Sequence, residues 1–405
     1  MKYIEKENLK KVSIAFVFTI VFLLPLPIFL GVSDFWEKQL DRNKMPYSFW
    51  HGLNPQHQMY IAFEIEQPYM SKLYYGLNAT SLDKVENITV PKIFHKYLLE
   101  GLDPNTIYYY QAAIVDGNGK EYLWGTLGKF RTAPSGFSPF NFTAYGDSQR
   151  FMGTGHFGSL AKAFGAKGFD TDFLFISGDV CQEPDNQATW NHFFKSAQQF
   201  SYKFPILSVP GNHDDNKNDT LYANYFGVTY SPDKFYYSFN YSNIQFIGMQ
   251  VSVSGEWDIT NPNTLENFVW LNQTLQNGQD KMFRILIFHR NVITANHRDD
   301  RAIPLMTPIL SHYNVSLVLH GHMHHYERLL INETTVLCIA GGGGFLDFTY
   351  KVQPESQLVR SVPHFIRVFQ EKENELIIKA RIPNGPIFDQ FKLIAQNGKA
   401  VQAEV

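Results

Sequence analysis

Short apolar runs alternate with amphipathic stretches through the C-terminal two thirds of the chain. Residues 188–200 and 265–275 carry apolar side chains at helical spacing, which predicts two helices between the runs. Strands that alternate with helices are typical of a layered α/β domain, which we expect over residues 138–395. The apolar runs predict strands at residues 140–145, 173–177, 206–209, 244–249, 285–288, 315–319 and 336–340.

The preceding segment, residues 45–134, has a different pattern. Residues 59–65 and 106–115 are apolar-rich and partly alternating, and glycine-rich turns such as 116–119 separate the runs. A segment of this length built from short strands predicts an all-β sandwich. We therefore expect two folded domains, the second ending in short strands over residues 365–394.

The N-terminus has a third pattern. Residues 12–32 are 21 uncharged residues, about the length that crosses a bilayer core as a helix. Lysines precede this run, which favours residues 1–11 as a cytoplasmic basic tail, the run as a transmembrane signal-anchor and residues 33–44 as a linker. A cleaved signal peptide is the alternative. Either reading exports the rest of the chain, to the cell membrane or to the medium.

Composition excludes some classes of protein. Among 405 residues, 44% are hydrophobic and 18% charged, which is typical of a globular chain. The net charge is -3 and no long basic run occurs, so nothing indicates a nucleic-acid partner. Cys181 and Cys338 allow one disulfide or two buried thiols. Eight Asn-x-Ser/Thr sequons make a glycoprotein plausible on export. The oligomeric state stays open.

Polar residues follow five of the first six predicted strands of the α/β domain. In such folds the carboxyl ends of the strands are where sites usually lie. Taken singly, each motif could be an ordinary turn or a core histidine. Their recurrence at successive strand ends indicates a common site. The motifs are Gly146-Asp147-Ser148-Gln149, Gly178-Asp179, Gly211-Asn212-His213-Asp214, His289 and Gly321-His322-Met323-His324.

These residue types suit a pair of divalent cations. Two cations about 4 Å apart can clamp the attacking and leaving oxygens of a phosphoryl group. Asp179 is a natural bridging carboxylate, and Asn212 is a neutral oxygen ligand that leaves the site positive enough for a phosphate. Imidazoles complete a mixed N/O set that suits Fe, Mn or Zn.

The five motifs, in this order over about 180 residues, resemble the calcineurin-like metallophosphoesterase superfamily. The preceding sandwich makes the chain similar to the purple acid phosphatase branch. Residues 99–110 resemble the tyrosine corner of a fibronectin type III-like domain, with Tyr108 as the corner residue. The resemblance implies a four-layer α/β (α+β) sandwich after a fibronectin-like one.

The resemblance also implies roles for the motif residues. Asp214 would steer the ring of His213, which would be the general acid or a phosphate contact, and His297 resembles a second pocket histidine. The implied first metal is held by Asp147, Asp179 and His324, and the second by Asp179, Asn212, His289 and His322.

Two positions depart from the family's patterns. Gln182 stands where the purple branch has a tyrosine, and Gln149 stands where other branches have a histidine. Either glutamine could give the first metal an amide oxygen, a weaker and neutral donor. We therefore expect looser binding of the first metal, no stable ferric site and no purple colour.

The sequence thus predicts an exported, membrane-anchored phosphohydrolase, acting by in-line attack of a metal-bound hydroxide on a phosphate ester. Resemblance to the purple branch favours monoesters. A phosphodiesterase on the same scaffold stays open as an alternative, as does a catalytically weak cell-surface binding protein with a degenerate metal site.

Overall fold

The computed structural model describes residues 44–149, 155–214, 220–227, 235–251, 257–295, 297–339, 341, 346–348 and 351–405. The predicted tail, membrane span and nearly all of the predicted linker lie outside these ranges. Within them, no helix combines the length and the apolar character needed to cross a bilayer.

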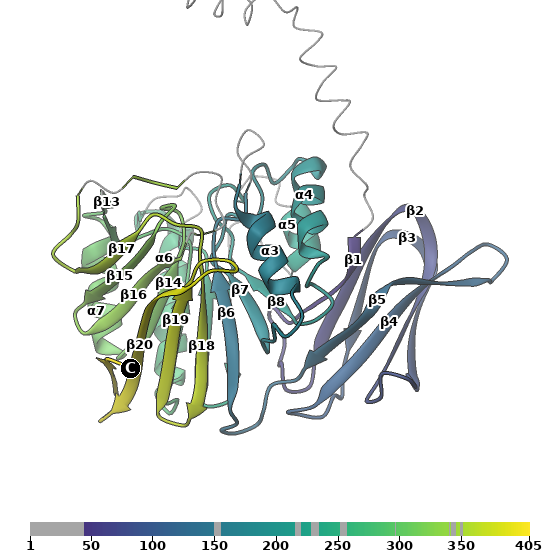
Figure 1. The fold of residues 1–405 in the computed structure, drawn as a ribbon, viewed down its shortest axis with the longest axis horizontal. Coiled ribbons are helices and arrows are strands. Elements are labelled where there is room, and N and C mark those ends of the chain that lie inside the picture. Colours follow the sequence, from purple (N-terminus) through teal and green to yellow (C-terminus); the bar gives the residue numbers. More distant parts are fainter. Residues whose placement is uncertain are drawn as a thin grey trace, which may run out of the picture. The chain divides into compact units, whose positions relative to one another are not determined.

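The N-terminal part of the described chain is an antiparallel sheet (Figure 1). Its second strand pairs with β1 through its first half and with β4 through its second half, and register shifts separate the halves. The sheet therefore folds back, so that β1 contacts β5. The strands are β1 Lys44–Phe49, β2 Met59–Gly76, β3 Lys84–Leu99, β4 Ile107–Val115 and β5 Glu121–Arg131.

Tyr108 makes the contact expected of a tyrosine corner. The side chain is 1% exposed, and its hydroxyl accepts a hydrogen bond from the main-chain N–H of Asp103 at 3.0 Å. The segment is thus all-β, as predicted, and Tyr108 is structural. Its assignment to the fibronectin type III class stays a prediction.

The rest of the described chain contains two seven-stranded sheets. The first has the order β21-β20-β19-β18-β6-β7-β8 and the second the order β17-β15-β16-β14-β11-β10-β9. The first comprises β6 Phe140–Tyr145, β7 Phe173–Ile176, β8 Ile206–Ser208, β18 Phe365–Lys372, β19 Glu375–Arg381, β20 Ile387–Gln396 and β21 Lys399–Ala403. The second comprises β9 Tyr236–Tyr241, β10 Ile244–Met249, β11 Phe283–Ile287, β14 Leu317–His320, β15 Tyr326–Ile331, β16 Thr334–Ile339 and β17 Ser356–Arg360.

The sheets pack face to face between two layers of helices, which confirms the predicted α/β sandwich. Phe142 of β6 meets Phe246 of β10 edge to face at 5.3 Å, whereas Tyr145 stacks on Phe157 of α3 on the other side of its sheet. Buried residues of α6 and α7 join those of β10, β11 and β14 in a second core cluster. The helices are α3 Phe157–Gly165, α4 Gln187–Ala197, α5 Thr220–Phe226, α6 Pro262–Asn277 and α7 Ala302–His312.

Strand periodicity located these elements well. Each of the seven predicted strands agrees with an observed strand within two residues at either end. The sequence did not single out α7, because Pro304 and Pro308 lie inside its apolar stretch. It also did not single out α3, which is only nine residues long.

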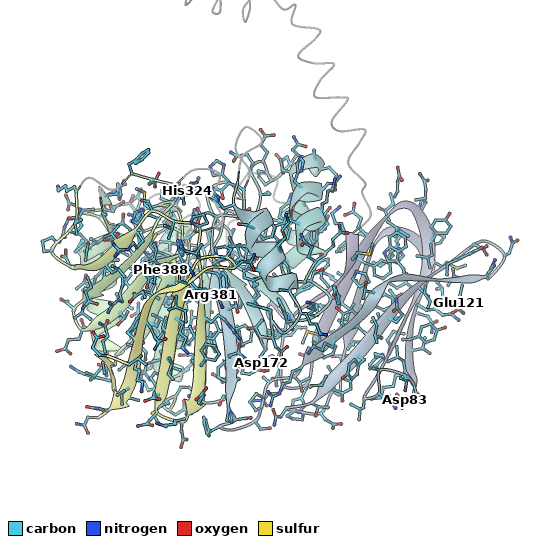
Figure 2. The ribbon with its side chains drawn as sticks, viewed as in Figure 1. Asp83, Glu121, Asp172, His324, Arg381 and Phe388 are labelled. Atoms are coloured by element: carbon cyan, nitrogen blue, oxygen red, sulfur yellow. The ribbon has the colours of Figure 1, made fainter. Side chains whose placement is uncertain are left out.

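Parallel pairing brings the motif-bearing strand ends together. β6, β7 and β8 are parallel neighbours in one sheet, and β11 and β14 are parallel neighbours in the other. Figure 2 shows His324, which follows β14, near the end of the sheets opposite to Asp172, which precedes β7. A short antiparallel hairpin follows β11. Its two strands have two residues each, β12 Ile293–Thr294 and β13 His297–Arg298.

The N-terminal sheet is joined to the α/β domain by buried polar contacts. Lys44 pairs with Glu64 at 2.8 Å and donates to Asn191 of α4 at 2.9 Å. His51 contacts the main chain of Ser208, at the end of β8, with the Ser208 N–H donating to Nε2 at 2.8 Å. Burial lowers the pKa of His51 to about 3, so the ring is neutral and can accept. The N-terminal sheet therefore covers β8, the edge strand that leads into residues 211–214.

We expect Glu64→Gln to destabilise the protein by about 3–5 kcal/mol, because it removes the carboxylate that pairs with the buried Lys44 charge. Urea unfolding followed by circular dichroism measures this loss. The control is Glu121→Gln, which removes a pair with Lys72 whose side chains are 33% and 35% exposed. A Glu64→Gln midpoint equal to that of the control would contradict the expectation.

Candidate metal centre

The motif residues sit on turns with unusual main-chain angles. Asp147, Asp179 and His322 adopt left-handed φ angles of 61°, 52° and 75°. Such angles are strained for residues other than glycine, and strain of this kind clusters at functional sites. Each of these residues lies two or three residues after the end of a strand, β6, β7 or β14.

Adjacent glycines allow the turns to approach one another. Gly178 has a φ of 92°, and a Cβ added there would lie 2.5 Å from Nδ1 of His289. A Cβ at Gly211 would lie 2.1 Å from Oδ1 of Asp179. Both glycines are therefore required by close contact with the candidate ligands.

Asp179, His289 and His322 place donor atoms within 4.8 Å of one another. His289 Nε2 lies 3.3 Å from Asp179 Oδ1 and 3.1 Å from Oδ1 of Asn212. The other ring nitrogen, Nδ1, donates to the carbonyl of Ser177 at 2.8 Å. Since a carbonyl only accepts, this bond leaves Nε2 as the nitrogen that faces the cluster.

A second group of donors adjoins the first through Asp179. Asp147 Oδ1 lies 3.3 Å from Nε2 of His324. The amide nitrogen of Gln149 lies 3.0 Å from Asp179 Oδ2 and 3.3 Å from His324 Nε2. Gln149 is 3% exposed, and its Oε1 has no hydrogen-bond partner among the described residues. Rotation of the amide by half a turn would present that oxygen to the same space.

The spacing of these atoms fits divalent cations. Donors bound at about 2.1 Å are separated by about 3.0 Å in an octahedral shell and about 3.4 Å in a tetrahedral one. The pairs above lie 3.0–3.3 Å apart. The structure thus brings the six predicted core ligands and Gln149 together, and their roles as ligands stay predictions.

The buried carboxylates shift the pKa values of the neighbouring imidazoles. Burial alone would lower the pKa of His289 and His324, but the carboxylates of Asp179 and Asp147 outweigh it and raise each pKa to about 9. Burial would raise the pKa of Asp179, yet the charge of His289 and its hydrogen bond hold it well below the usual range. Burial, then the charges of His289 and Arg290, lower the pKa of His322 to about 2.

Asp214 does not steer His213 as the sequence predicted. Its buried carboxylate accepts main-chain N–H groups of Gly211, Val180 and Cys181 at 2.9–3.1 Å. These bonds tie the turn after β8 to the turn after β7. Burial, then the charge of Asp179, raises the pKa of Asp214 to about 7.

Gln182 contacts the His213 ring in its place. Its amide nitrogen lies 3.0 Å from Nδ1 of His213, and its main-chain carbonyl lies 3.1 Å from the same atom. The main-chain N–H of His213 donates to Asp179 Oδ1 at 2.8 Å. Gln182 thus lies against the candidate acid, and the described contacts do not place it on the metal cluster.

His297 is exposed, and its Nδ1 lies 2.7 Å from the amide nitrogen of Asn291. The described contacts do not join it to the cluster, so its pocket role stays a prediction. Sequence reasoning passed over Asp347, whose carboxylate accepts the main-chain N–H of His324 at 2.8 Å. It also passed over His156 at the start of α3, whose pKa is lowered by burial and then by the charge of His324. Neither residue follows a predicted strand, so no sequence signal marked them.

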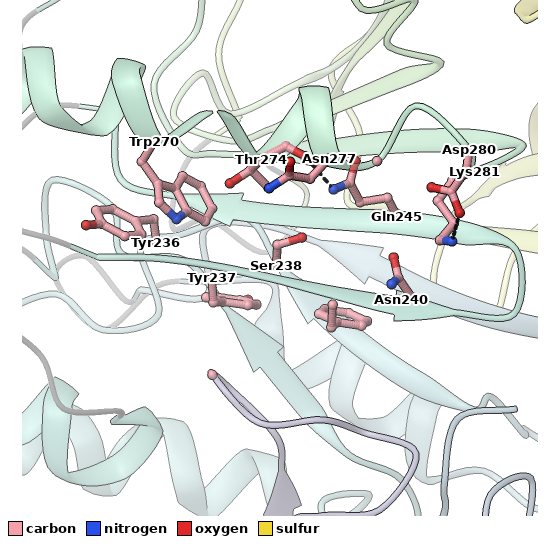
Figure 3. A pocket seen from close by; sticks show the side chains of 13 residues that line it. Tyr236, Tyr237, Ser238, Asn240, Gln245, Trp270, Thr274, Asn277, Asp280 and Lys281 are labelled. Atoms are coloured by element: carbon pink, nitrogen blue, oxygen red, sulfur yellow. Dashed lines mark hydrogen bonds and ion pairs between the residues drawn. The ribbon is translucent and has the colours of Figure 1, made fainter. Parts of the chain in front are cut away.

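A cavity of about 620 Å³ lies elsewhere, between β9 and α6 (Figure 3). Trp270 stacks on Tyr236 at one part of its wall, with ring centroids 4.3 Å apart. At another part of the wall, the side-chain amide of Gln245 donates to the carbonyl of Thr274 at 2.9 Å. None of the predicted site residues lines this cavity, so it is separate from the candidate metal centre.

Residues 140–326 match the family model described as calcineurin-like phosphoesterase. An uncharacterized protein of Mycobacterium tuberculosis is 26% identical over 355 residues, which cover 72% of this chain and 66% of that protein. Purple acid phosphatase 15 of Arabidopsis thaliana is 23% identical over 278 residues, which cover 58% of this chain and 49% of that protein. The chain thus spans half to two thirds of the length of these relatives.

Two solved structures share the fold. The purple acid phosphatase PPD1 from yellow lupin (Lupinus luteus) seeds has a TM-score of 0.72 at 15% identity, covering 86% of this chain and 74% of its own. The structure of PhoD has a TM-score of 0.67 at 14% identity, and the match covers 89% of this chain and 92% of PhoD. Together with the family match, they confirm the resemblance that the motifs predicted.

We expect Gly211→Ala to weaken metal binding at least about tenfold, because the added Cβ would push Asp179 from its position. Metal content after dialysis against known free Mn²⁺ or Zn²⁺ measures the effect. Gly136→Ala is the control, since a Cβ there has no atom within 4 Å. Equal metal content in the two variants would contradict the assigned role of Gly211.

At pH 7 both His289 and His324 carry an extra proton in the metal-free protein, because each pKa is about 9. Binding of divalent cations to their Nε2 atoms should therefore release about two protons per chain, and the apparent affinity should rise with pH up to about 9. Calorimetric titration in buffers of different ionisation enthalpy counts the protons. His312→Gln, on α7, should not change the count. A release near zero would show that these imidazoles do not bind metal.

Proposed function

We propose that the protein is a phosphohydrolase that uses two divalent metal ions, since residues 140–326 match the family model described as calcineurin-like phosphoesterase. The observation that carries the proposal is the meeting of Asp179 with the neutral amide of Asn212 and the imidazoles of His289 and His322. Among the candidate ligands only Asp147 and Asp179 are carboxylates. Bound cations would therefore keep excess positive charge for an anionic substrate.

The candidate ligands divide into two sets that share Asp179. Asp147, His324 and the amide of Gln149 would hold the first ion, and Asn212, His289 and His322 the second. Bound there, the two ions would supply Lewis-acid stabilisation to both the attacking and the leaving oxygen of a phosphoryl group. The neutral amide of Gln149 beside the first ion favours divalent Mn, Fe or Zn over ferric iron.

His213 is the candidate acid. Its main-chain N–H donates to Asp179, which fixes the residue beside the cluster, and Gln182 holds Nδ1. Nε2 is then the nitrogen that can protonate a leaving oxygen or contact a phosphate oxygen. The likeness to purple acid phosphatases favours phosphomonoesters as substrates.

The proposal includes the location of the enzyme. Residues 12–32 would anchor the chain in the cell membrane, and the preceding lysines would stay in the cytoplasm, so that the phosphoesterase domain is exported. Support comes from the hydropathy of the sequence. Protease treatment of intact cells tests it, since an exported domain would be digested.

The purified full-length chain, stripped of metal and refilled with Mn²⁺, Zn²⁺ or Fe²⁺, should hydrolyse a p-nitrophenyl phosphate monoester. Asn212→Ala should lower kcat/KM at least about 100-fold by removing a ligand. His213→Ala should lower kcat about 100-fold or more by removing the acid. Asn118→Ala and His312→Ala, which alter exposed residues, are the matched controls.

Turnover that is independent of metal, or equal in Asn212→Ala and Asn118→Ala, would overturn the proposal. Faster hydrolysis of the bis-ester than of the monoester would assign the enzyme to the phosphodiesterases. Well under one bound metal per chain, together with no turnover of either ester by the folded protein, would favour the binding-protein alternative.

A further inference from the structure

Four strands lie at the outer edges of the two seven-stranded sheets, namely β8, β21, β9 and β17. An uncovered edge strand can pair with another chain, and proteins usually prevent this with charged residues, proline or bulges. The N-terminal sheet covers β8, β21 carries Lys399, and β17 has a register shift and ends in Arg360. Residues 236–241 of β9 include no charge and no proline, and they pair with β10 without a register shift. Among these four strands, β9 alone lacks such protection.

The open side of β9 presents main-chain hydrogen-bonding groups. The hairpin with β10 closes on Tyr241 and Ile244 with two residues between them, so this pair exchanges both of its hydrogen bonds. Because bonded and non-bonded pairs alternate along the ladder, the N–H and C=O groups of Asn240, Ser238 and Tyr236 point away from β10. No strand or loop of the described chain bonds to these groups. An added strand would satisfy them.

Two cavities adjoin this edge. The cavity of about 620 Å³ is lined by Ser238 and Asn240 of β9, by the last turns of α6 and by Gly52 (Figure 3). A second cavity of about 450 Å³ is lined by the same two residues of β9 and by residues 53–56. Successive side chains of a strand point to opposite faces of a sheet, so an added strand would direct its side chains alternately toward α6 and toward residues 52–56.

The lining residues determine which kind of segment fits. The only charged side chains that line either cavity are those of Asp280 and Lys281, which pair with each other. A charged side chain on a bound segment would therefore lose hydration without gaining an opposite charge. The stacked rings of Tyr236 and Trp270 line the first cavity and favour contact with an apolar or aromatic side chain.

We propose that the edge of β9 binds an extended, uncharged polypeptide segment of a partner protein as an added strand, with an apolar or aromatic side chain against Trp270. Main-chain bonds to β9 would supply affinity, and the two cavities would supply specificity. A single strand fits this place better than the edge of a second copy, which would bring its own sheet and its own α6 between α6 and residues 52–56. None of the predicted site residues lines either cavity, so the interaction is independent of the proposed hydrolysis.

The test uses the purified full-length chain, with a phage-displayed library of random heptapeptides as the probe. Selected peptides, made synthetically, should be uncharged and should slow hydrogen exchange at the amides of Ser238 and Asn240. Ser238→Pro should weaken their binding in calorimetry at least about tenfold, because proline removes an outward N–H that the pairing of β9 with β10 does not use. Asn240→Lys should weaken it similarly by placing a charge on the edge. Asn118→Lys, at an exposed position between β4 and β5, is the matched control and should equal the parent protein.

Peptide binding by Asn240→Lys with the affinity of the parent protein would overturn the proposal, as would a library that yields no peptide able to bind the parent. Because Asn240 is exposed, this variant keeps the test decisive if Ser238→Pro does not fold. Slow exchange of the Ser238 amide in the free protein would also contradict the proposal, since the edge would then be covered. A concentration-dependent dimer that Asn240→Lys abolishes would assign the edge to a second copy of the chain and overturn the assignment to a partner protein.

Discussion

The buried carboxylate of Asp179 is the constraint around which the α/β domain is arranged. Its two oxygens contact the main chain of His213, the amide of Gln149 and the ring of His289. These groups come from three different strand ends. A buried negative charge is costly unless positive charge surrounds it. The ring of His289, whose pKa is raised to about 9 beside this carboxylate, can supply part of that charge, and in the proposed enzyme cations would supply it.

The rest of the fold brings these strand ends together around Asp179. Parallel pairing in both sheets delivers the strand ends to the same edge. Glycines at positions 178 and 211 remove the Cβ atoms that would hold the turns apart. The N-terminal sheet contributes no ligand, but its His51 bonds to the end of β8 and so braces the turn that carries Asn212.

Sequence reasoning failed where the answer depended on which neighbour a side chain meets. Asp214 and His213 are adjacent in sequence, which suggested a steering pair, yet adjacent residues on a tight turn point in different directions. Asp214 turns inward to main-chain donors, whereas Gln182, 31 residues earlier, meets the ring of His213. Likewise, nothing in the sequence distinguished Arg290 from Arg298, because their partners, His322 and Glu355, come from distant segments.

The sequence by itself determined the alternation of strands and helices and the identity of the strand-end motifs. Both are local properties: apolar periodicity reports burial, and a glycine before an aspartate reports a turn. Only the tertiary structure decided how the motifs are partnered, because two sheets had to pack before donors from separate strands could lie 3.0–3.3 Å apart. Distances of that kind depend on contacts far apart in the chain, which no local pattern encodes.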